Sequence, residues 1–496
     1  MDLLQADLSA VTEAIQNKKI SAVETTQFFL DRVQKLDQHI NEFTYASNTA
    51  VKEAELLDQK IAHGENVGPL AGVVFGIKDL LCTKGMPSTA ASKMLSGFVP
   101  PYDATVVSRL KKAGAIILGK LNQDEFAMGS SNETSVYGAC HNPWDKSRVP
   151  GGSSGGSAAA QAARLTMATI GTDTGGSIRQ PASFCGVVGV KPTYGRVSRY
   201  GIIAYASSLD QAGPIVSSVK DAALTLETIC GQDSYDGTTS DHLVEKFSQN
   251  LNGNIKGKKI GVIKEFVQHI PDAHIAQSFQ LALDTVKQLG AEIVEVSIPL
   301  TQYAVPMYYL ISASEASSNF ARYDGVKYGY RTPHDKTSNL SLDDFYSLSR
   351  GEGFGAEVKR RIMLGTYALS AGYSDAFYLK ACKVRRLLRQ QFLDAFEKCD
   401  LIMGPVTTAP AFKLGEKSVD PLKNYLNDIF TTSTNLCGLP GMSVPFSTAR
   451  EGNSILPIGV QLTAPHFQEQ SLLNFAYAIE NTTPAADFRK LKPHVY

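Results

Sequence analysis

Two glycine-rich turns, each ending in a serine, carry the residues of this chain that are best suited to chemistry. The first turn lies in Val149-Pro-Gly-Gly-Ser-Ser-Gly-Gly-Ser157 and the second in Gly171-Thr-Asp-Thr-Gly-Gly-Ser-Ile-Arg179. Glycines at this density let several backbone N–H groups converge on one point, which suits an anion site or an oxyanion hole. The flanking residues 158–163 and 184–190 are apolar, so a flexible linker is disfavoured.

Three kinds of site are built on glycine-rich turns and can be compared with this sequence. A phosphate-binding loop needs a lysine directly after the glycines, and neither turn has one. The segment Gly152-Ser-Ser-Gly-Gly156 matches the G-x-S-x-G pattern of α/β-hydrolases, but the polar, proline-broken residues 142–150 before it do not predict the required strand. The third possibility is a serine nucleophile that is activated by a base other than histidine.

Lys78 is the candidate base, because it follows the apolar run Val73-Val-Phe-Gly-Ile77. A lysine in an apolar strand most often lies at a sheet edge, extends its amine to solvent or forms a buried ion pair. Burial can instead lower the lysine pKa, because it disfavours the charged form. A neutral lysine is a competent general base for a serine hydroxyl.

Lys78, Ser153 and Ser177 together resemble the Ser-cisSer-Lys triad of the amidase signature family. The family's signature segments are present as Pro150-Gly-Gly-Ser-Ser-Gly-Gly-Ser157, Gly171-Thr-Asp-Thr-Gly-Gly-Ser-Ile-Arg-Gln-Pro181 and Phe184-Cys-Gly-Val-Val-Gly-Val-Lys-Pro192. The resemblance implies an α/β fold in which residues 1–496 form a single large domain. A mixed central β-sheet would be flanked by helices, with the active site in the glycine-rich zone and residues 1–60 packing on the domain as a helical segment.

Further motifs resemble one group within this family, the A subunits of glutamyl-tRNA(Gln) amidotransferases. They are Lys120-Leu-Asn-Gln-Asp-Glu-Phe-Ala-Met-Gly129, Lys191-Pro-Thr-Tyr-Gly-Arg-Val-Ser-Arg199, Ser207-Ser-Leu-Asp-Gln211, Ser314-Glu-Ala-Ser-Ser-Asn-Phe-Ala-Arg-Tyr-Asp-Gly325 and Gly353-Phe-Gly-Ala-Glu-Val-Lys-Arg-Arg-Ile362. The likeness therefore covers essentially the whole chain. It implies a glutaminase that supplies ammonia for converting Glu-tRNA(Gln) to Gln-tRNA(Gln).

The same resemblance implies a role for each residue of the triad. Ser177 would form a γ-glutamyl ester with glutamine, and Ser153, after a cis peptide bond, would bridge Ser177 and a neutral Lys78. Lys78 would act first as a base toward Ser177 and then as an acid toward the leaving ammonia. The backbone amides around Thr174, Gly175, Gly176 and Ser177 would form the oxyanion hole, at about 3 kcal/mol per donor. We expect Ser154 and Ser157 to serve only the turn or a helix N-terminus.

Recognition of the glutamine α-amino and α-carboxylate groups is implied for Tyr308, Arg361 and Asp428. An arginine binds a carboxylate with two parallel hydrogen bonds, and an aspartate pairs with an ammonium group. Tyr309 and Arg360 are adjacent to two of these residues, so an offset of one position stays open, and Asp428 could instead cap a helix.

The partners implied by the resemblance are the B and C subunits of a heterotrimer. The B subunit would use ATP and Mg²⁺, bind the tRNA and receive the ammonia, and the small C subunit would lie between the other two. No cofactor or metal would be bound by this chain. Whether the complex acts on Glu-tRNA(Gln), Asp-tRNA(Asn) or both stays open.

Two other functions remain alternatives. A free-standing amidase would hydrolyse other small amides with the same triad and would not need Arg361 or Asp428. A catalytically inactive scaffold would use the glycine-rich zone only to bind an anion, although the joint presence of Lys78, Ser153 and Ser177 argues against it.

Alternating strands and helices must position these residues. Apolar runs predict strands near residues 71–77, 115–118, 259–263, 291–298, 401–403 and 455–462. Helical spacing predicts helices within the first 60 residues and near residues 273–289 and 378–396. One helix of the first group should begin at the capping box of Ser21 and Glu24. This alternation is typical of an α/β fold.

Composition narrows the class of protein further. The chain has 496 residues, of which Lys+Arg number 48 and Asp+Glu number 48. The resulting net charge of zero disfavours a general polyanion binder and leaves most tRNA contacts to a partner. Seven scattered cysteines without a C-x-x-C pair indicate reduced thiols, and no signal peptide or membrane span is recognised, so we expect a cytoplasmic protein.

Overall fold

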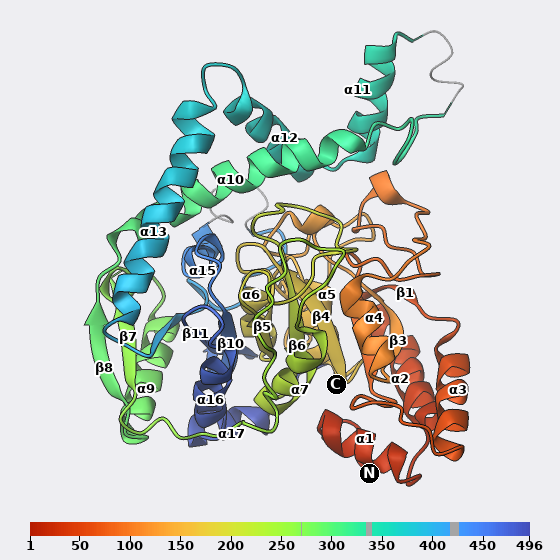
Figure 1. The fold of residues 1–496 in the computed structure, drawn as a ribbon, viewed down its shortest axis with the longest axis vertical. Helices are drawn as coiled ribbons and strands as arrows, with labels where there is room; N and C mark the ends of the chain where they lie inside the picture. Colours follow the sequence, from red (N-terminus) through yellow and green to blue (C-terminus); the bar gives the residue numbers. More distant parts are fainter. Residues whose placement is uncertain (269, 334–339, 417–425) are drawn as a thin grey trace.

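The strands of the described residues form one mixed sheet of eleven strands, in the order β1-β3-β2-β4-β6-β5-β10-β11-β9-β7-β8 (Figure 1). The structure is a computed structural model that describes residues 1–268, 270–333, 340–416 and 426–496. The strands are β1 (Phe43–Ala46), β2 (Val74–Lys78), β3 (Ile116–Leu121), β4 (Ala168–Asp173), β5 (Val188–Lys191), β6 (Gln211–Val216), β7 (Lys259–Ile263), β8 (Glu292–Val296), β9 (Leu401–Pro405), β10 (Gly441–Glu451) and β11 (Ser454–Thr463).

Helices cover this sheet on both sides and also form a separate group above it (Figure 1). The α-helices are α1 (Leu8–Gln16), α2 (Ala22–Leu36), α3 (Ala50–Ala62), α4 (Thr105–Lys112), α5 (Gly155–Ala162), α6 (Arg179–Cys185), α7 (Val219–Ile229), α8 (Lys264–Val267), α9 (Ala273–Gln288), α10 (Ala304–Asn319), α11 (Leu342–Gly353), α12 (Ala356–Leu369), α13 (Lys380–Phe396), α15 (Thr432–Leu436), α16 (Glu469–Glu480) and α17 (Thr483–Arg489). The shorter turns are η1 (Asp37–His39), η2 (Lys93–Leu95), η3 (Glu125–Ala127), η4 (Pro299–Tyr303), η5 (Phe320–Arg322), η7 (Asp375–Leu379) and η8 (Leu426–Asp428).

The parallel strands β2 and β4 position the chemistry. Both are buried along their whole length, and Ile77 pairs with Ile170, so the carboxyl ends of the two strands lie side by side. β2 ends at Lys78 and β4 ends at Asp173, just before the second Gly-Gly-Ser turn. Polar groups that follow adjacent parallel strands meet at one edge of a sheet, where α/β proteins commonly bind their ligands.

A second apolar core packs beneath the helices α10, α12 and α13. Tyr308, Phe320, Phe354 and Phe430 belong to it, and Phe126 from the sheet side completes an aromatic cluster with Phe320 and Phe354. Because this core joins α10 and α12 to the body of the molecule, it carries side chains of the helical group toward the edge where β2 and β4 end.

The predicted single α/β domain with a mixed, helix-flanked sheet is confirmed, and so are most of its predicted elements. The capping box at Ser21 and Glu24 begins α2, and β7 has the predicted bounds. The helical reading of the first 60 residues is wrong at Phe43–Ala46, which form the edge strand β1. This strand has only four residues, none fully buried, and it reaches its partner β3 far along the chain.

None of the helices in the described ranges is long and apolar enough to cross a membrane. All seven cysteines are free thiols, six of them buried and Cys382 partly exposed.

Candidate active site

The amine of Lys78 is fully buried and surrounded by hydroxyl groups. Its Nζ donates hydrogen bonds to the Oγ of Ser153 at 2.7 Å, the Oγ of Ser154 at 2.9 Å and the Oγ1 of Thr172 at 3.0 Å. The strand pairing explains this arrangement, because Thr172 lies on β4 beside the end of β2. Ser153 and Ser154 belong to the first glycine-rich turn, which packs over this edge of the sheet.

Burial lowers the pKa of Lys78 to about 7, against a usual value of 10.5. The negative charges of Asp124, Asp173 and Asp210 oppose this shift but do not cancel it. Among the described residues, no carboxylate forms an ion pair with this amine. Lys78 therefore exchanges its proton near neutral pH, as a general base for a hydroxyl group must.

The first glycine-rich turn is tightly packed around a cis peptide bond between Gly152 and Ser153. A Cβ atom on Gly152 would lie 2.8 Å from the backbone nitrogen of Ser131, so a larger residue does not fit there. Gly151, at φ 84°, adopts a conformation that side chains rarely tolerate. The glycines thus allow Ser153 to approach Lys78 closely.

Ser154 has a contact that the sequence interpretation missed. It is the N-cap residue of α5, yet its hydroxyl does not cap the helix. The Ser154 Oγ instead accepts from Lys78 and from the Thr172 amide at 3.2 Å, and donates to the Thr172 carbonyl at 3.0 Å. Ser157 does not bond to Lys78, and its Oγ donates to the Ile170 carbonyl of β4 at 3.3 Å, so it links α5 to the sheet instead of serving the turn.

Ser177 lies on the second turn, between β4 and α6, and is 8% exposed. Its carbonyl accepts a hydrogen bond from the Ser154 amide at 3.2 Å, which joins the two turns. Within the part of the chain that the structure describes, the Ser177 hydroxyl has no hydrogen-bond partner. The structure thus contains the Lys78–Ser153 half of the predicted relay, and the Ser177 hydroxyl is not bonded to Ser153.

The backbone amides of the second turn differ in their availability. The Gly176 amide donates to Asp173 Oδ1 at 2.8 Å, so it is already engaged. No acceptor for the amides of Thr174, Gly175 and Ser177 occurs among the described residues. Of the predicted oxyanion donors, Gly176 is therefore turned toward Asp173, and the other three amides are available.

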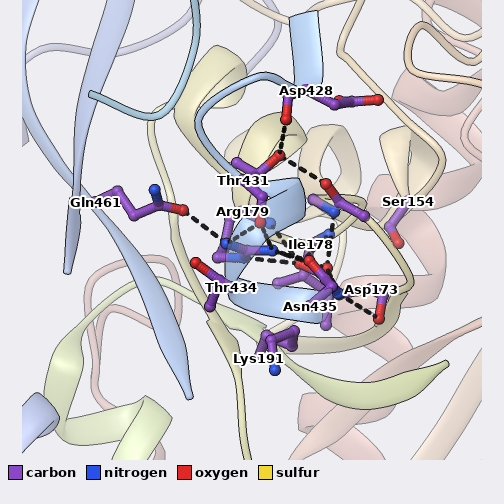
Figure 2. Close-up of polar contacts among 12 residues, drawn as sticks. Ser154, Asp173, Ile178, Arg179, Lys191, Asp428, Thr431, Thr434, Asn435 and Gln461 are labelled. Atoms are coloured by element: carbon purple, nitrogen blue, oxygen red, sulfur yellow. Dashed lines mark hydrogen bonds and ion pairs between the residues drawn. The ribbon is translucent and has the colours of Figure 1, made fainter. Parts of the chain in front are cut away.

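A buried ion pair between Asp173 and Arg179 supports this turn (Figure 2). Arg179 Nε lies 3.0 Å from Asp173 Oδ2, and the guanidinium also donates to the Gln461 Oε1 at 2.7 Å and the Thr431 carbonyl at 3.2 Å. Asn435 donates to Asp173 Oδ1 at 2.8 Å. Burial raises the pKa of Asp173, but the Arg179 charge and these hydrogen bonds outweigh it, and the pKa falls to about 2.

Tyr308 on α10 and Asp428 in η8, between β9 and α15, both approach the second turn. A Cβ on Gly175 would lie 2.6 Å from the Tyr308 Cζ, so the ring packs directly on that glycine. The Thr431 hydroxyl links η8 to the same turn, donating to the Gly175 carbonyl at 2.6 Å and to the Asp428 carbonyl at 3.2 Å. Both predicted residues are therefore near the turn that carries Ser177.

Arg361 on α12 is buried, whereas its neighbour Arg360 is exposed. Arg361 Nε donates to Glu357 Oε1 at 2.8 Å, its Nη1 donates to the Tyr205 hydroxyl at 2.7 Å, and its guanidinium lies over the Tyr309 ring at 5.1 Å. The Arg361 charge also lowers the pKa of Asp428, which indicates that the two groups are close. The structure thus favours Arg361 over Arg360, and assigns Tyr309 to the packing of Arg361.

The carboxyl group of Asp428 is buried, and burial raises its pKa to about 7. Its strongest partner is the Ser130 hydroxyl, which donates to Oδ2 at 2.8 Å. A cationic ligand such as an ammonium group would favour the charged form of this buried carboxyl group, because an opposite charge nearby lowers a carboxyl pKa.

Sequence reasoning did not single out Asp173, Arg179, Asn435, Ser130 and Thr172 as parts of the site. Asp173 and Arg179 had a signal, because they flank the second Gly-Gly-Ser turn at the points where a buried charge pair could hold it. Asn435 and Ser130 had none, since their partners lie far away in the sequence.

Comparison with known proteins shows which family the sequence of this chain matches. The amidase family profile matches residues 24–473. A protein from Bdellovibrio bacteriovorus, named as the A subunit of glutamyl-tRNA(Gln) amidotransferase, is 63% identical over 495 residues, covering 100% of both chains. The protein of the same name from Koribacter versatilis is 52% identical, covering 98% of this chain and 100% of its own.

Solved structures agree with these relatives. The crystal structure of the A subunit of glutamyl-tRNA(Gln) amidotransferase from Thermotoga maritima has a TM-score of 0.79 at 40% identity, covering 97% of this chain and 96% of its own. The native peptide amidase from Stenotrophomonas maltophilia has a TM-score of 0.80 at 28% identity, covering 99% of this chain and 98% of its own.

Proposed function

The chain belongs to the amidase family, and we propose that it is the glutamine-hydrolysing A subunit of a tRNA-dependent amidotransferase. The relatives that carry this name match it from end to end, including one at 63% identity. Within the site, the observation that carries the proposal is the buried amine of Lys78, held by three hydroxyl groups, with its pKa lowered to about 7.

The acylation step uses the two glycine-rich turns together. The Ser177 Oγ attacks the side-chain amide carbon of glutamine while its proton passes through the Ser153 hydroxyl to neutral Lys78. The tetrahedral intermediate then collapses, the carbon–nitrogen bond breaks, and the proton returns from Lys78 through Ser153 to the departing nitrogen. The products of this step are ammonia and a γ-glutamyl ester on Ser177, which water hydrolyses to glutamate and free Ser177.

The oxyanion of the intermediate would be stabilised by the amides of Thr174, Gly175 and Ser177. These amides follow a buried strand and are held by the Asp173–Arg179 pair, so they need little reorganisation when charge develops. Each donor of this kind is worth about 3 kcal/mol in the transition state.

Recognition of glutamine falls to three residues outside the glycine-rich turns. Asp428 would bind the α-amino group and Arg361 the α-carboxylate, with Tyr308 lining the space beside Gly175. Arg361 is already bonded to Glu357 and Tyr205, so its guanidinium is held in place before glutamine binds.

The rest of the amidotransferase is assigned to partner proteins. The B subunit would use ATP and Mg²⁺ to activate the glutamate of Glu-tRNA(Gln), receive the ammonia and hold most of the tRNA, and the C subunit would join the other two. The zero net charge of this chain fits that division of labour, because tRNA binding depends on a basic surface. The reaction would take place in the cytoplasm, where tRNA is aminoacylated.

A free-standing amidase is the second candidate, favoured by the close structural likeness to peptide amidase. It differs from the first proposal in requiring no partner subunits and no α-amino or α-carboxylate group on the substrate.

One experiment separates the two candidates. The chain is purified from its native cells with whatever binds it, and the Ser177→Ala variant is assembled with the same partners. We expect B and C subunits to co-purify, and the variant to lose glutaminase activity while keeping amidation that uses free ammonia. A chain that purifies alone and hydrolyses simple amides would support the free amidase, and loss of ammonia-dependent amidation would assign Ser177 a structural role.

A further inference from the structure

A hollow of about 450 Å³ lies between α13, the C-terminal end of α15 and the loops that follow β5 and β11. Arg385, Arg386 and Arg389 of α13 line it, together with His466 from the loop after β11. Helices α13 and α15 are in contact, with α13 at the edge of the molecule (Figure 1). Lys78, Ser153 and Ser177 do not line this hollow, so it is separate from the proposed active site.

The lining of the hollow is positively charged without a balancing acid. It contains no aspartate or glutamate. The three arginines lie within one turn of helix, where like charges four residues apart destabilise the helix. Two acids outside the lining already have partners: Glu315 accepts from the Ser208 hydroxyl at 2.6 Å, and Glu469 accepts from the Thr193 amide at 2.9 Å.

The three arginines differ in how they are held. Arg385 donates to the Leu436 carbonyl at 2.6 Å, the Ser208 hydroxyl at 2.8 Å and the Ser208 carbonyl at 3.0 Å, so its guanidinium is fixed. Arg386 and Arg389 are exposed and, within the described ranges, form no ion pair or hydrogen bond. The hollow therefore offers two unpaired guanidinium groups beside one that is fixed in position.

His466 adds a hydrogen-bonding group to the same wall. Its Nε2 lies 2.8 Å from the Cys437 carbonyl, and a carbonyl only accepts, so Nε2 carries a proton. Nδ1 donates to a phosphate oxygen only when the ring is also protonated there. Burial lowers the pKa of His466, the bond to the Cys437 carbonyl and the Glu469 charge oppose this shift, and the charges of Arg389 and Lys191 add to it. A bound anion would raise the pKa of His466, opposite to the effect of the two positive charges.

We propose that this hollow, the arginine pocket of Arg385, Arg386, Arg389 and His466, binds the diphosphate group of a small molecule. Guanidinium groups match phosphate oxygens in pairs, and two free forks fit two phosphate groups. The volume is that of a small-ligand site. RNA would instead need an extended basic surface, and this chain has zero net charge.

Calorimetric titration of the full-length chain with inorganic pyrophosphate and, separately, with ADP tests the proposal. We expect saturable binding with a Kd below about 1 mM. The double variant Arg386→Gln/Arg389→Gln should weaken it roughly tenfold or more, because each fork contributes charge-assisted hydrogen bonds. Tighter binding of ADP would identify a nucleotide as the source of the diphosphate, and tighter binding of pyrophosphate an inorganic one.

The matched control is Lys380→Gln/Lys383→Gln, which removes the same charge from exposed positions of the same helix outside the pocket. It should bind both probes as the original chain does. Equal weakening in the two double variants, or no saturable binding, would overturn the proposal. Tighter binding of a short RNA at the same arginines would assign the surface to nucleic acid and overturn it as well.

NMR of the imidazole supplies a second readout that a merely structural role for the arginines would not produce. Saturating pyrophosphate should raise the pKa of His466, because a nearby anion favours the charged imidazole. An unchanged His466 titration despite binding would place the ligand elsewhere and contradict the proposal.

Discussion

A buried hydrogen bond of 2.9 Å joins the Lys78 amine to the Ser154 hydroxyl, beside the 2.7 Å bond from the same amine to Ser153. Because Ser154 is also bonded to both main-chain polar groups of Thr172, the first glycine-rich turn is fixed to β4 at the position of the base. A charged lysine can donate to all three surrounding hydroxyls, and a neutral one can accept from one of them.

The rate of glutamyl-enzyme formation should rise with pH and level off above about 7. Lys78 must be neutral to accept the proton, and its pKa is lowered to about 7 by burial. Rapid-quench measurement of the acyl-enzyme across pH would show this. In Asp124→Asn the midpoint should move to lower pH, because the Asp124 charge raises the Lys78 pKa. A midpoint that is unmoved in this variant would mean that another group limits the rate.

Ser154→Ala should lower the acylation rate roughly ten- to hundredfold, because a hydrogen bond to a charged group is worth about 1.5–3 kcal/mol. Ser157→Ala is the matched control, since Ser157 is equally buried in the helix that Ser154 precedes, and among the described residues its hydroxyl bonds only to the Ile170 carbonyl. It should leave the rate unchanged. Single-turnover kinetics of the two variants decide the matter, and equal rates for both would limit Ser154 to a role in the fold.

Gly175→Ala should raise the glutamine KM about tenfold, since the new methyl group meets the Tyr308 ring and overpacking costs about 1–3 kcal/mol. Gly237→Ala, whose Cβ would have no neighbour within 4 Å, is the control and should behave as the original chain. Replacing Tyr308 with alanine in the Gly175→Ala background should add little further loss. Fully additive losses would show that the two residues act separately.

Glutamine affinity should increase as pH rises through about 7. The Asp428 carboxyl, with its pKa raised to about 7, is neutral below that pH and then cannot pair with the α-amino group. Below the midpoint the Kd should increase by about tenfold per pH unit. Calorimetry on Ser177→Ala, which binds without turnover, measures this, and adding Asp428→Asn should leave a weak, pH-independent Kd. A steep pH dependence that survives Asp428→Asn would contradict the assignment.

Asp173→Asn should lower the free energy of unfolding by about 3–5 kcal/mol, because it leaves Arg179 buried without its partner. The folded pKa of Asp173, about 2, lies below its usual 3.8, so its stabilising effect is complete above pH 3.8 and is lost toward pH 2. Urea unfolding at several pH values should therefore show a gap that closes in acid. The exposed Asp487→Asn variant serves as control, and a gap of constant size would argue against the ion pair as its cause.

Much of the fold could be predicted from local sequence, because buried strands such as β7 are short apolar runs and α2 carries its own capping signal. The edge strand β1 escaped prediction because it is only partly buried and depends on a distant partner, β3. Local signals are weakest where pairing decides the structure.

The candidate site also has parts that local sequence reveals and parts that only the fold reveals. Lys78, Ser153 and Ser177 could be selected because glycine-rich turns and a lysine in an apolar strand are visible in the sequence. Two contacts of Asp173 could not be predicted in this way: the hydrogen bond from the Gly176 amide and the one from Asn435. Both depend on the three-dimensional course of the second turn and of α15.

The two largest apolar cores correspond to the proposed division between reaction chemistry and substrate recognition. The proposed base ends β2, Ser177 and the available amides follow β4, and Ser153 lies in the turn before α5, whereas Tyr308 and Arg361 lie on α10 and α12. Tyr308 belongs to the second core. Such an arrangement is modular in the evolutionary sense, since the helical group can diverge while the acyl-transfer machinery stays fixed. Changes confined to the helical group would therefore alter which amide binds and leave the groups that act on its carbonyl in place.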